Sequence, residues 1–123
     1  MRSMTLEKLP MDLSVCRLHS LKDVDCGDFF FLCKTDEEIS LVCRTADAPA
    51  PCDGREDGWR AFRVQGTLDF SLVGILARLT AVLAEKGIGL FAVSTYNTDY
   101  ILVKRERFDD AMDALIRAGY DVV

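Results

Sequence analysis

The second half of the chain carries apolar side chains at regular intervals. Residues 59–65 alternate between apolar and polar side chains, which is the pattern of a half-buried strand. Residues 71–86 place apolar side chains three and four positions apart, which predicts an amphipathic helix. Gly87 follows at the position where a helix end favours glycine, so we expect the helix to stop there.

The remaining pattern completes a recurrent fold. Residues 88–95 and 100–104 predict two strands, and the polar residues 96–99 between them predict a hairpin turn. Residues 106–118 again show helical spacing, and residues 120–123 predict a short last strand. The order strand, helix, strand, strand, helix, strand is that of the α+β ferredoxin-like βαββαβ fold, in which two helices cover one face of a four-stranded antiparallel sheet.

The first half of the chain predicts strands and no long helix. Three apolar runs of strand length lie at 13–18, 29–33 and 39–43, with short polar segments between them. Such a unit cannot cover both faces of its own sheet, so we expect it to pack on something else. Residues 45–58 concentrate Pro, Gly and Asp, which predicts a boundary between modules 1–58 and 59–123.

Charge is distributed as unevenly as the predicted elements. The formal net charge of the 123 residues is −5; residues 1–58 hold 7 basic and 12 acidic side chains, and residues 59–123 hold 8 of each. An acidic chain repels nucleic-acid phosphates. No apolar run approaches the length that spans a bilayer, and residues 1–10 lack the apolar segment of a secretion signal. We therefore expect a cytoplasmic protein that binds neither nucleic acid nor membrane.

All five cysteines precede residue 59. An odd number without a secretion signal argues against a disulfide framework, and no pair has the C-x-x-C spacing of a zinc site. We expect the cysteines in strands to be buried, namely Cys16, Cys33 and Cys43, and those in polar loops to be exposed, namely Cys26 and Cys52. The sequence predicts no metal site and no cofactor.

Catalytic chemistry has little support in this sequence. His19 is the only histidine, and we expect it to be a surface loop residue. Neither the serines nor the cysteines have an evident base near them in sequence. A mechanism using two carboxylates, Asp69 and Asp99, remains an open alternative.

A binding site is better supported, at the loop that precedes the first predicted helix. Residues 66–70 lead into that helix, and Gly74 lies in its first turn, where free backbone N–H groups attract a carboxylate. Asn97 and Asp99 in the predicted hairpin offer polar groups for an ammonium or guanidinium ion. An anion site beside a cation site is what an amino acid requires. The alternative is that Asp69 and Asp99 only cap a helix and form a turn.

Several of these segments resemble a known family. Residues 74–90, GILARLTAVLAEKGIGL, resemble the first-helix signature of the ACT domain, a βαββαβ regulatory module that binds amino acids and similar ligands. Residues 68–75 and 94–103 are similar to the ACT subgroup of the cytosolic arginine sensors of the TOR pathway and of small bacterial tandem ACT-like proteins. Residues 1–58 resemble the degenerate, mostly β, ACT-like module that precedes the ACT domain in those bacterial proteins.

The resemblance implies a non-enzymatic regulatory protein that binds a small molecule, an amino acid, at a module interface. The eukaryotic sensors carry four modules in one chain and this chain has two, so a homodimer is expected. General ACT domains often have Asp-x-Pro-Gly at the ligand loop, whereas four residues separate Asp69 from Gly74 here. The implied ligand-binding residues are Asp69, Phe70, Ser71, Val73, Gly74, Ile75, Ser94, Thr95, Asn97 and Asp99.

Two alternatives to this function stay open. One is a structural or protein-interaction module of the same fold that binds no ligand. The other, less favoured, is a small enzyme that uses Asp69 and Asp99. Neither the residues nor the resemblance identifies the ligand.

Overall fold

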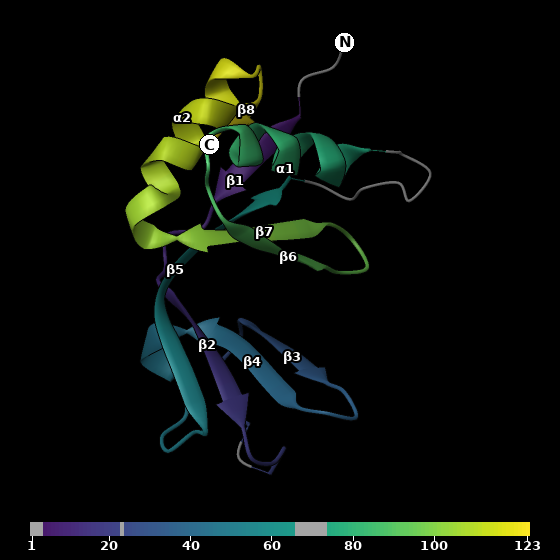
Figure 1. The fold of residues 1–123 in the computed structure, drawn as a ribbon. Helices are drawn as coiled ribbons and strands as arrows, with labels where there is room; N and C mark the ends of the chain where they lie inside the picture. Colours follow the sequence, from purple (N-terminus) through teal and green to yellow (C-terminus); the bar gives the residue numbers. More distant parts are fainter. Residues whose placement is uncertain (1–3, 23, 66–73) are drawn as a thin grey trace. The chain divides into compact units, whose positions relative to one another are not determined.

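The computed structural model describes residues 4–22, 24–65 and 74–123 (Figure 1). Its chain forms two compact units, which we call the helical unit (Met1–Pro10 and Arg60–Val123) and the β unit (Met11–Trp59). In chain order the described elements are β1 (Thr5–Lys8), β2 (Leu13–Leu18), β3 (Phe30–Lys34), β4 (Ile39–Arg44), η1 (Thr45–Asp47), β5 (Gly54–Val64), α1 (Ile75–Glu85), β6 (Leu90–Ser94), β7 (Asp99–Lys104), η2 (Arg105–Arg107), α2 (Phe108–Arg117) and β8 (Asp121–Val122).

The helical unit contains the predicted βαββαβ order, from β5 to β8. Its described strands follow the order β6, β7, β5, β1, β8, with β6 antiparallel to β7 and β1 antiparallel to β5. The sheet therefore has one strand more than predicted, because β1 lies between β5 and β8 and pairs with β8 in parallel. Strand β1 was not predicted, because only one of its four residues, Leu6, is a buried apolar residue and a single position gives no pattern.

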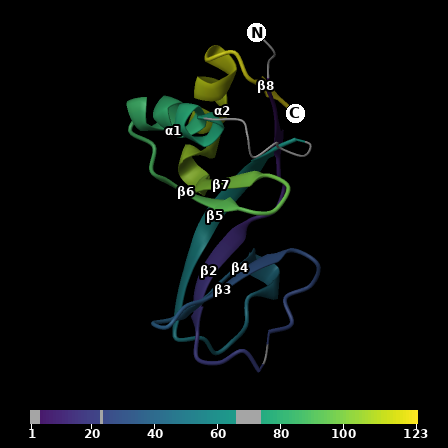
Figure 2. The same cartoon turned by 90° about the vertical axis from the view of Figure 1, so that its right-hand side faces the viewer.

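Both helices pack on one face of this sheet. Figures 1 and 2 show α1 and α2 on the same side of β6 and β7. The core of the unit joins them to the strands through Leu6, Phe62, Val64, Ile75, Leu79, Leu83, Ile88, Ile101, Val103, Phe108, Ala111, Met112 and Leu115. This arrangement confirms the α+β ferredoxin-like fold. None of the described helices combines the length and hydrophobicity needed to cross a membrane.

Glycine ends α1 as predicted. Gly87 has a φ of +68°, which favours glycine, and its N–H donates to the Ala84 carbonyl at 3.0 Å. The Ile88 N–H donates to the Leu83 carbonyl at 3.0 Å, and the Ile88 side chain enters the core. These two bonds form the Schellman motif, which satisfies carbonyls at the helix end. The predicted helix began at residue 71, but residues 71–73 lie outside the described part of the chain.

The β unit is an antiparallel sheet in which β4 pairs with β3 and β2, and β2 pairs with the first half of β5. Its described residues contain no α-helix, in agreement with the prediction, and η1 is a single 3-10 turn. Strand β5 begins at Gly54, inside the segment predicted as a linker, and the two units divide within it. The assignment of 1–58 and 59–123 to a degenerate and a complete module remains a proposal on domain organisation.

Two of the cysteine predictions are wrong. Cys33 is exposed because β3 is an edge strand that contains no fully buried side chain; Phe30 and Leu32 in this strand are each 40% exposed. Cys26 is buried because its loop folds onto the apolar face of the β unit. The burial of Cys16 and Cys43 is confirmed.

Candidate functional site

The turn between β6 and β7 is tied to the end of β5. Within the turn, the Thr95 N–H and hydroxyl both donate to the Thr98 carbonyl, at 2.8 and 2.9 Å. The Thr98 hydroxyl, in a side chain that is 8% exposed, donates to the Val64 carbonyl at 2.8 Å. Since Val64 ends β5, this bond holds the turn beside the point where the chain leaves for α1.

A carboxylate lies in the last strand pair before this turn. Ser94 and Asp99 lie directly opposite each other, and the Ser94 hydroxyl donates to Asp99 Oδ1 at 2.6 Å. Asp99 precedes Ile101 by two residues, and successive side chains of a strand alternate between faces. Because Ile101 is in the core beneath the helices, Asp99 lies on the helix-covered side of the sheet.

Helix α1 starts at the same end of the helical unit as this turn, in both views (Figures 1 and 2). Gly74 precedes the helix with a φ of +81°, a conformation that favours glycine, and offers no capping side chain. The Ile75 side chain is buried in the core, so this residue presents only its backbone to a ligand. The first N–H groups of a helix have no partner within the helix, which makes this a position where a carboxylate is favourable.

The opposite face of the sheet holds a polar cavity of about 250 Å³. At its base, the Arg63 guanidinium contacts the Glu7 carboxylate, with Nε to Oε1 at 3.1 Å and Nη2 to Oε2 at 3.3 Å. Arg63 Nη1 also donates to the Tyr100 hydroxyl at 3.2 Å. The bond with Glu7, and after it the bond with Tyr100, raises the pKa of Arg63 and so favours the charged guanidinium. The cavity is lined by Glu7, Arg63, Val64, Thr95, Asn97, Thr98 and Tyr100.

The described candidates therefore fall into three places. Thr95 and Asn97 line the cavity, Ser94 and Asp99 form a pair on the helix side, and Gly74 and Ile75 begin α1. The other four candidates lie outside the described residues, namely Asp69, Phe70, Ser71 and Val73.

Five of the seven cavity residues were not among the predicted site residues, namely Glu7, Arg63, Val64, Thr98 and Tyr100. The sequence did give a signal for two of them: Arg63 is a polar position of the alternating segment 59–65, and Tyr100 is an outward position of the strand predicted at 100–104. Glu7 gave no such signal, because the strand that carries it was not predicted.

The single histidine lies apart from the predicted site residues. The His19 side chain is 92% exposed, with Nδ1 at 3.7 Å from Asp53 Oδ2, which confirms it as a surface residue. Throughout 4–22, 24–65 and 74–123, no group of three or more His, Cys, Asp or Glu side chains is arranged to hold a metal ion.

Solved structures with this fold include two bacterial proteins that match almost the whole chain. A crystal structure from Agrobacterium tumefaciens has a TM-score of 0.88 and 29% identity, and the match covers 100% of this chain and 94% of that one. A protein of unknown function from Vibrio cholerae has a TM-score of 0.75 and 25% identity, over 94% of this chain and 89% of that one.

A more distant likeness extends to an enzyme. The aspartate kinase of Clostridium acetobutylicum has a TM-score of 0.67 and 13% identity, over 89% of this chain and 33% of that one. At this identity the likeness concerns the fold alone.

The sequence itself places the chain in a family. No protein of curated function matches it. The family model of the ACT domain matches residues 54–117, just over half of the chain, including β5, both helices and the β6–β7 hairpin. An ACT domain is typically a regulatory domain that binds a small molecule, and the chain belongs to the ACT domain family.

Proposed function

We propose that this chain is a non-enzymatic regulatory protein that binds an amino acid where the β6–β7 hairpin meets the start of α1. The observation that carries the proposal is the Ser94–Asp99 pair, at 2.6 Å, at the end of the sheet where α1 begins. A carboxylate oriented by a hydroxyl is already positioned to accept bonds from a cation, so little ordering is needed on binding.

In this proposal the two ends of the ligand are bound by different elements. Backbone N–H groups near Ser71 and Gly74 hold the ligand carboxylate, because the start of a helix favours an anion. Asp99 holds the amino group or a cationic side chain. Thr95 and Asn97 add polar contacts from the turn. Asp69, Phe70, Val73 and Ile75 complete the proposed loop.

The finer assignments belong to the same proposal. The likeness of residues 68–75 and 94–103 to the subgroup of the arginine sensors supports an amino acid ligand. A homodimer would supply the four modules that those sensors carry in one chain, with ligand between modules. We also propose that the protein acts in the cytoplasm without nucleic acid or membrane partners, where ligand binding biases the packing of modules.

Thermal-shift measurements of the full chain with each proteinogenic amino acid test this function. A ligand at about 100 times its Kd stabilises the native state by about 2.7 kcal/mol, so a rise in Tm with one or a few amino acids is expected. Asp99→Asn should abolish the rise, whereas Asp113→Asn, an exposed change on α2, should preserve it. Failure of every amino acid to raise Tm, or equal loss in both variants, would overturn the proposal.

A second function, a protein-interaction module, is favoured by a different observation. The edge strand β3 exposes Phe30 and Leu32, each 40% accessible, and edge strands can pair with a strand of another chain. On this alternative, Phe30→Lys abolishes association while the amino acid screen gives no response.

A further inference from the structure

One buried cluster of the β unit is built largely from thiols. Its buried residues are Cys16, Cys26, Leu41 and Cys43. Cys52 packs against this cluster while remaining partly accessible. Four of the five cysteines thus lie in one small core, and all are free.

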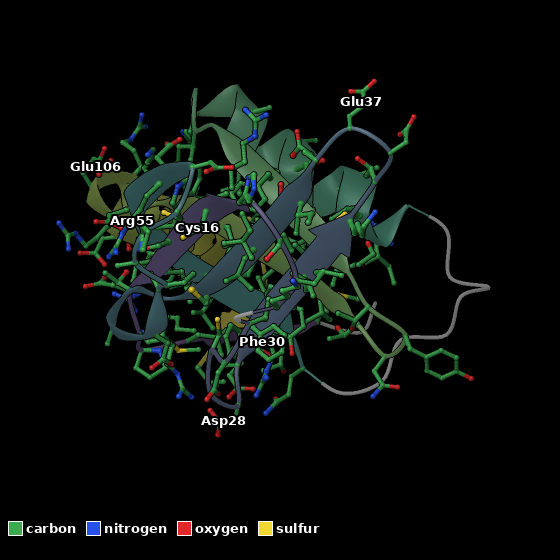
Figure 3. All side chains as sticks on the ribbon, turned by 90° about the horizontal axis from the view of Figure 1, so that it is seen from below. Cys16, Asp28, Phe30, Glu37, Arg55 and Glu106 are labelled. Atoms are coloured by element: carbon green, nitrogen blue, oxygen red, sulfur yellow. The ribbon has the colours of Figure 1, made fainter. Side chains whose placement is uncertain are left out.

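Strand pairing explains how the four thiols meet. Cys43 lies opposite Ser14, and Cys16 lies opposite Leu41, so Cys16 and Cys43 share one face of the β2–β4 pair. Loops carrying Cys26 and Cys52 cover that face. Figure 3 shows Cys16 of β2 close to Arg55 of β5, and these two residues are also paired in register.

The thiols differ in their access to solvent. Cys16, Cys26 and Cys43 are buried, and burial raises the pKa of each thiol, to about 12 for Cys43. Cys52 alone among the four is partly exposed, and its Sγ donates to the Gly54 carbonyl at 3.3 Å. An oxidant in solution therefore reaches Cys52 first, because oxidation follows accessibility.

Cys16 is the cluster member best placed to react next. Cys52 packs against the cluster that contains Cys16, and the Asp53 N–H donates to the Arg17 carbonyl at 2.9 Å, so the residues that follow the two cysteines are bonded to each other. Burial raises the Cys16 pKa, and the guanidinium of Arg55, which is paired in register with Cys16, partly offsets this rise and so favours the thiolate that attacks sulfur.

We propose that the β unit contains an oxidative modification site, in which a hydroperoxide converts Cys52 and Cys16 into a disulfide. In the first step the Cys52 sulfur attacks the hydroperoxide, the O–O bond breaks, and Cys52 sulfenic acid and an alcohol (water, if the oxidant is hydrogen peroxide) form. In the second step the Cys16 sulfur attacks the Cys52 sulfur, and the hydroxyl leaves as water with the Cys16 proton. Two thiols are oxidised and one hydroperoxide is reduced.

The disulfide would tie the loop before β5 to strand β2. A cross-link between distant positions restricts the unfolded chain, and small domains often rely on such links for stability. This site lies in the β unit and is independent of the proposed amino acid site, so either proposal can fail alone.

Peptide mapping of the full chain tests the site. Trypsin separates Cys16 (peptide 9–17), Cys43 (35–44) and Cys52 (45–55), and leaves Cys26 and Cys33 together on 23–34. After hydrogen peroxide treatment and alkylation, we expect a reducible cross-link between peptides 9–17 and 45–55, and a higher Tm that dithiothreitol reverses. Cys52→Ser should abolish both changes. Cys33→Ser, which alters an exposed cysteine outside the cluster, should preserve both.

A further variant keeps the test informative if a polar change in the core prevents folding. In Cys16→Ala, Cys52 should accumulate as sulfenic acid that dimedone captures, because its reaction partner is missing. The proposal is overturned if wild-type Cys52 proceeds to sulfinic acid without a cross-link. It is also overturned if the cross-link joins Cys26 to Cys43, or if oxidation is confined to Cys33.

Discussion

The hydrogen bond from the Thr98 hydroxyl to the Val64 carbonyl attaches the β6–β7 turn to the end of β5, and one substitution can remove it. Thr98→Val keeps the shape of the side chain and removes the donor. The bond is 2.8 Å long and buried, and a buried acceptor left without its partner costs about 1–3 kcal/mol. Because the turn keeps its Thr95–Thr98 bonds, we expect a loss of about 1–2 kcal/mol in the free energy of unfolding.

Urea denaturation followed by the helical circular dichroism signal measures this loss in the helical unit, which holds both described α-helices. With a urea m-value of about 2 kcal/mol/M, the midpoint should fall by about 0.5–1 M. Thr80→Val is the matched control, since the Thr80 hydroxyl donates to the Ala77 carbonyl on an exposed part of α1. That change should alter stability by less than about 0.5 kcal/mol.

Equal stability of Thr98→Val and Thr80→Val would contradict this expectation. It would mean that the Val64 carbonyl is satisfied without Thr98, and that the turn is not anchored to β5 by this bond. A large loss in both variants would likewise refute it, because a general cost of replacing Thr by Val would then explain the effect.

Three other changes test the packing and the ion pairs. Leu79→Ala removes a fully buried side chain of α1 and should cost about 2–5 kcal/mol, measured by the same denaturation. Glu7→Gln breaks a partly exposed pair with Arg63 and should cost less than about 1 kcal/mol, with a difference from wild type that shrinks in high salt. The hydrogen bond from the Ser14 hydroxyl lowers the pKa of Asp57 most, and the bond from Arg55 lowers it further. Ser14→Ala should therefore raise that pKa toward its ordinary value in an NMR titration. Because its pKa is lower in the folded state, Asp57 stabilises the fold above the unfolded-state pKa, and this stabilisation is lost as the pH falls through the folded-state pKa. The variant should therefore also show a weaker pH dependence of stability in acid.

The sequence predicted most of the helical unit because its elements are strongly periodic. The α1 stripe, the closing Gly87 and the β6–β7 turn each rely on local chemistry that is visible in a few neighbouring residues. Strand β1 could not be predicted in this way, because its place in the sheet depends on pairing with Val64 and Val122, which are far along the chain.

The β unit was harder to predict for a related reason. The run of apolar residues in β3 suggested burial, but the strand lies at a sheet edge, and its position cannot be read from local composition. Cys26 looked exposed in a polar loop and is buried, because its loop folds over a distant pair of strands. In both cases long-range packing determined the burial.

The candidate site shows the same division. The hairpin polar groups Ser94 and Asp99 could be predicted from turn chemistry and from family resemblance, and the pair is made within one hairpin. The Arg63–Glu7 contact across β5 and β1 could not, because it joins residues 56 positions apart.

We propose that an amino acid binds where the β6–β7 hairpin meets the start of α1. Two-dimensional amide NMR spectra of the full chain, recorded with each proteinogenic amino acid in turn, locate such binding residue by residue. We expect at least one amino acid to shift the amide signals of Gly74 and of residues 94–99 in a saturable way, and Asp99→Asn to weaken the effect. Saturable shifts confined to the β unit, or no shifts with any amino acid, would contradict it.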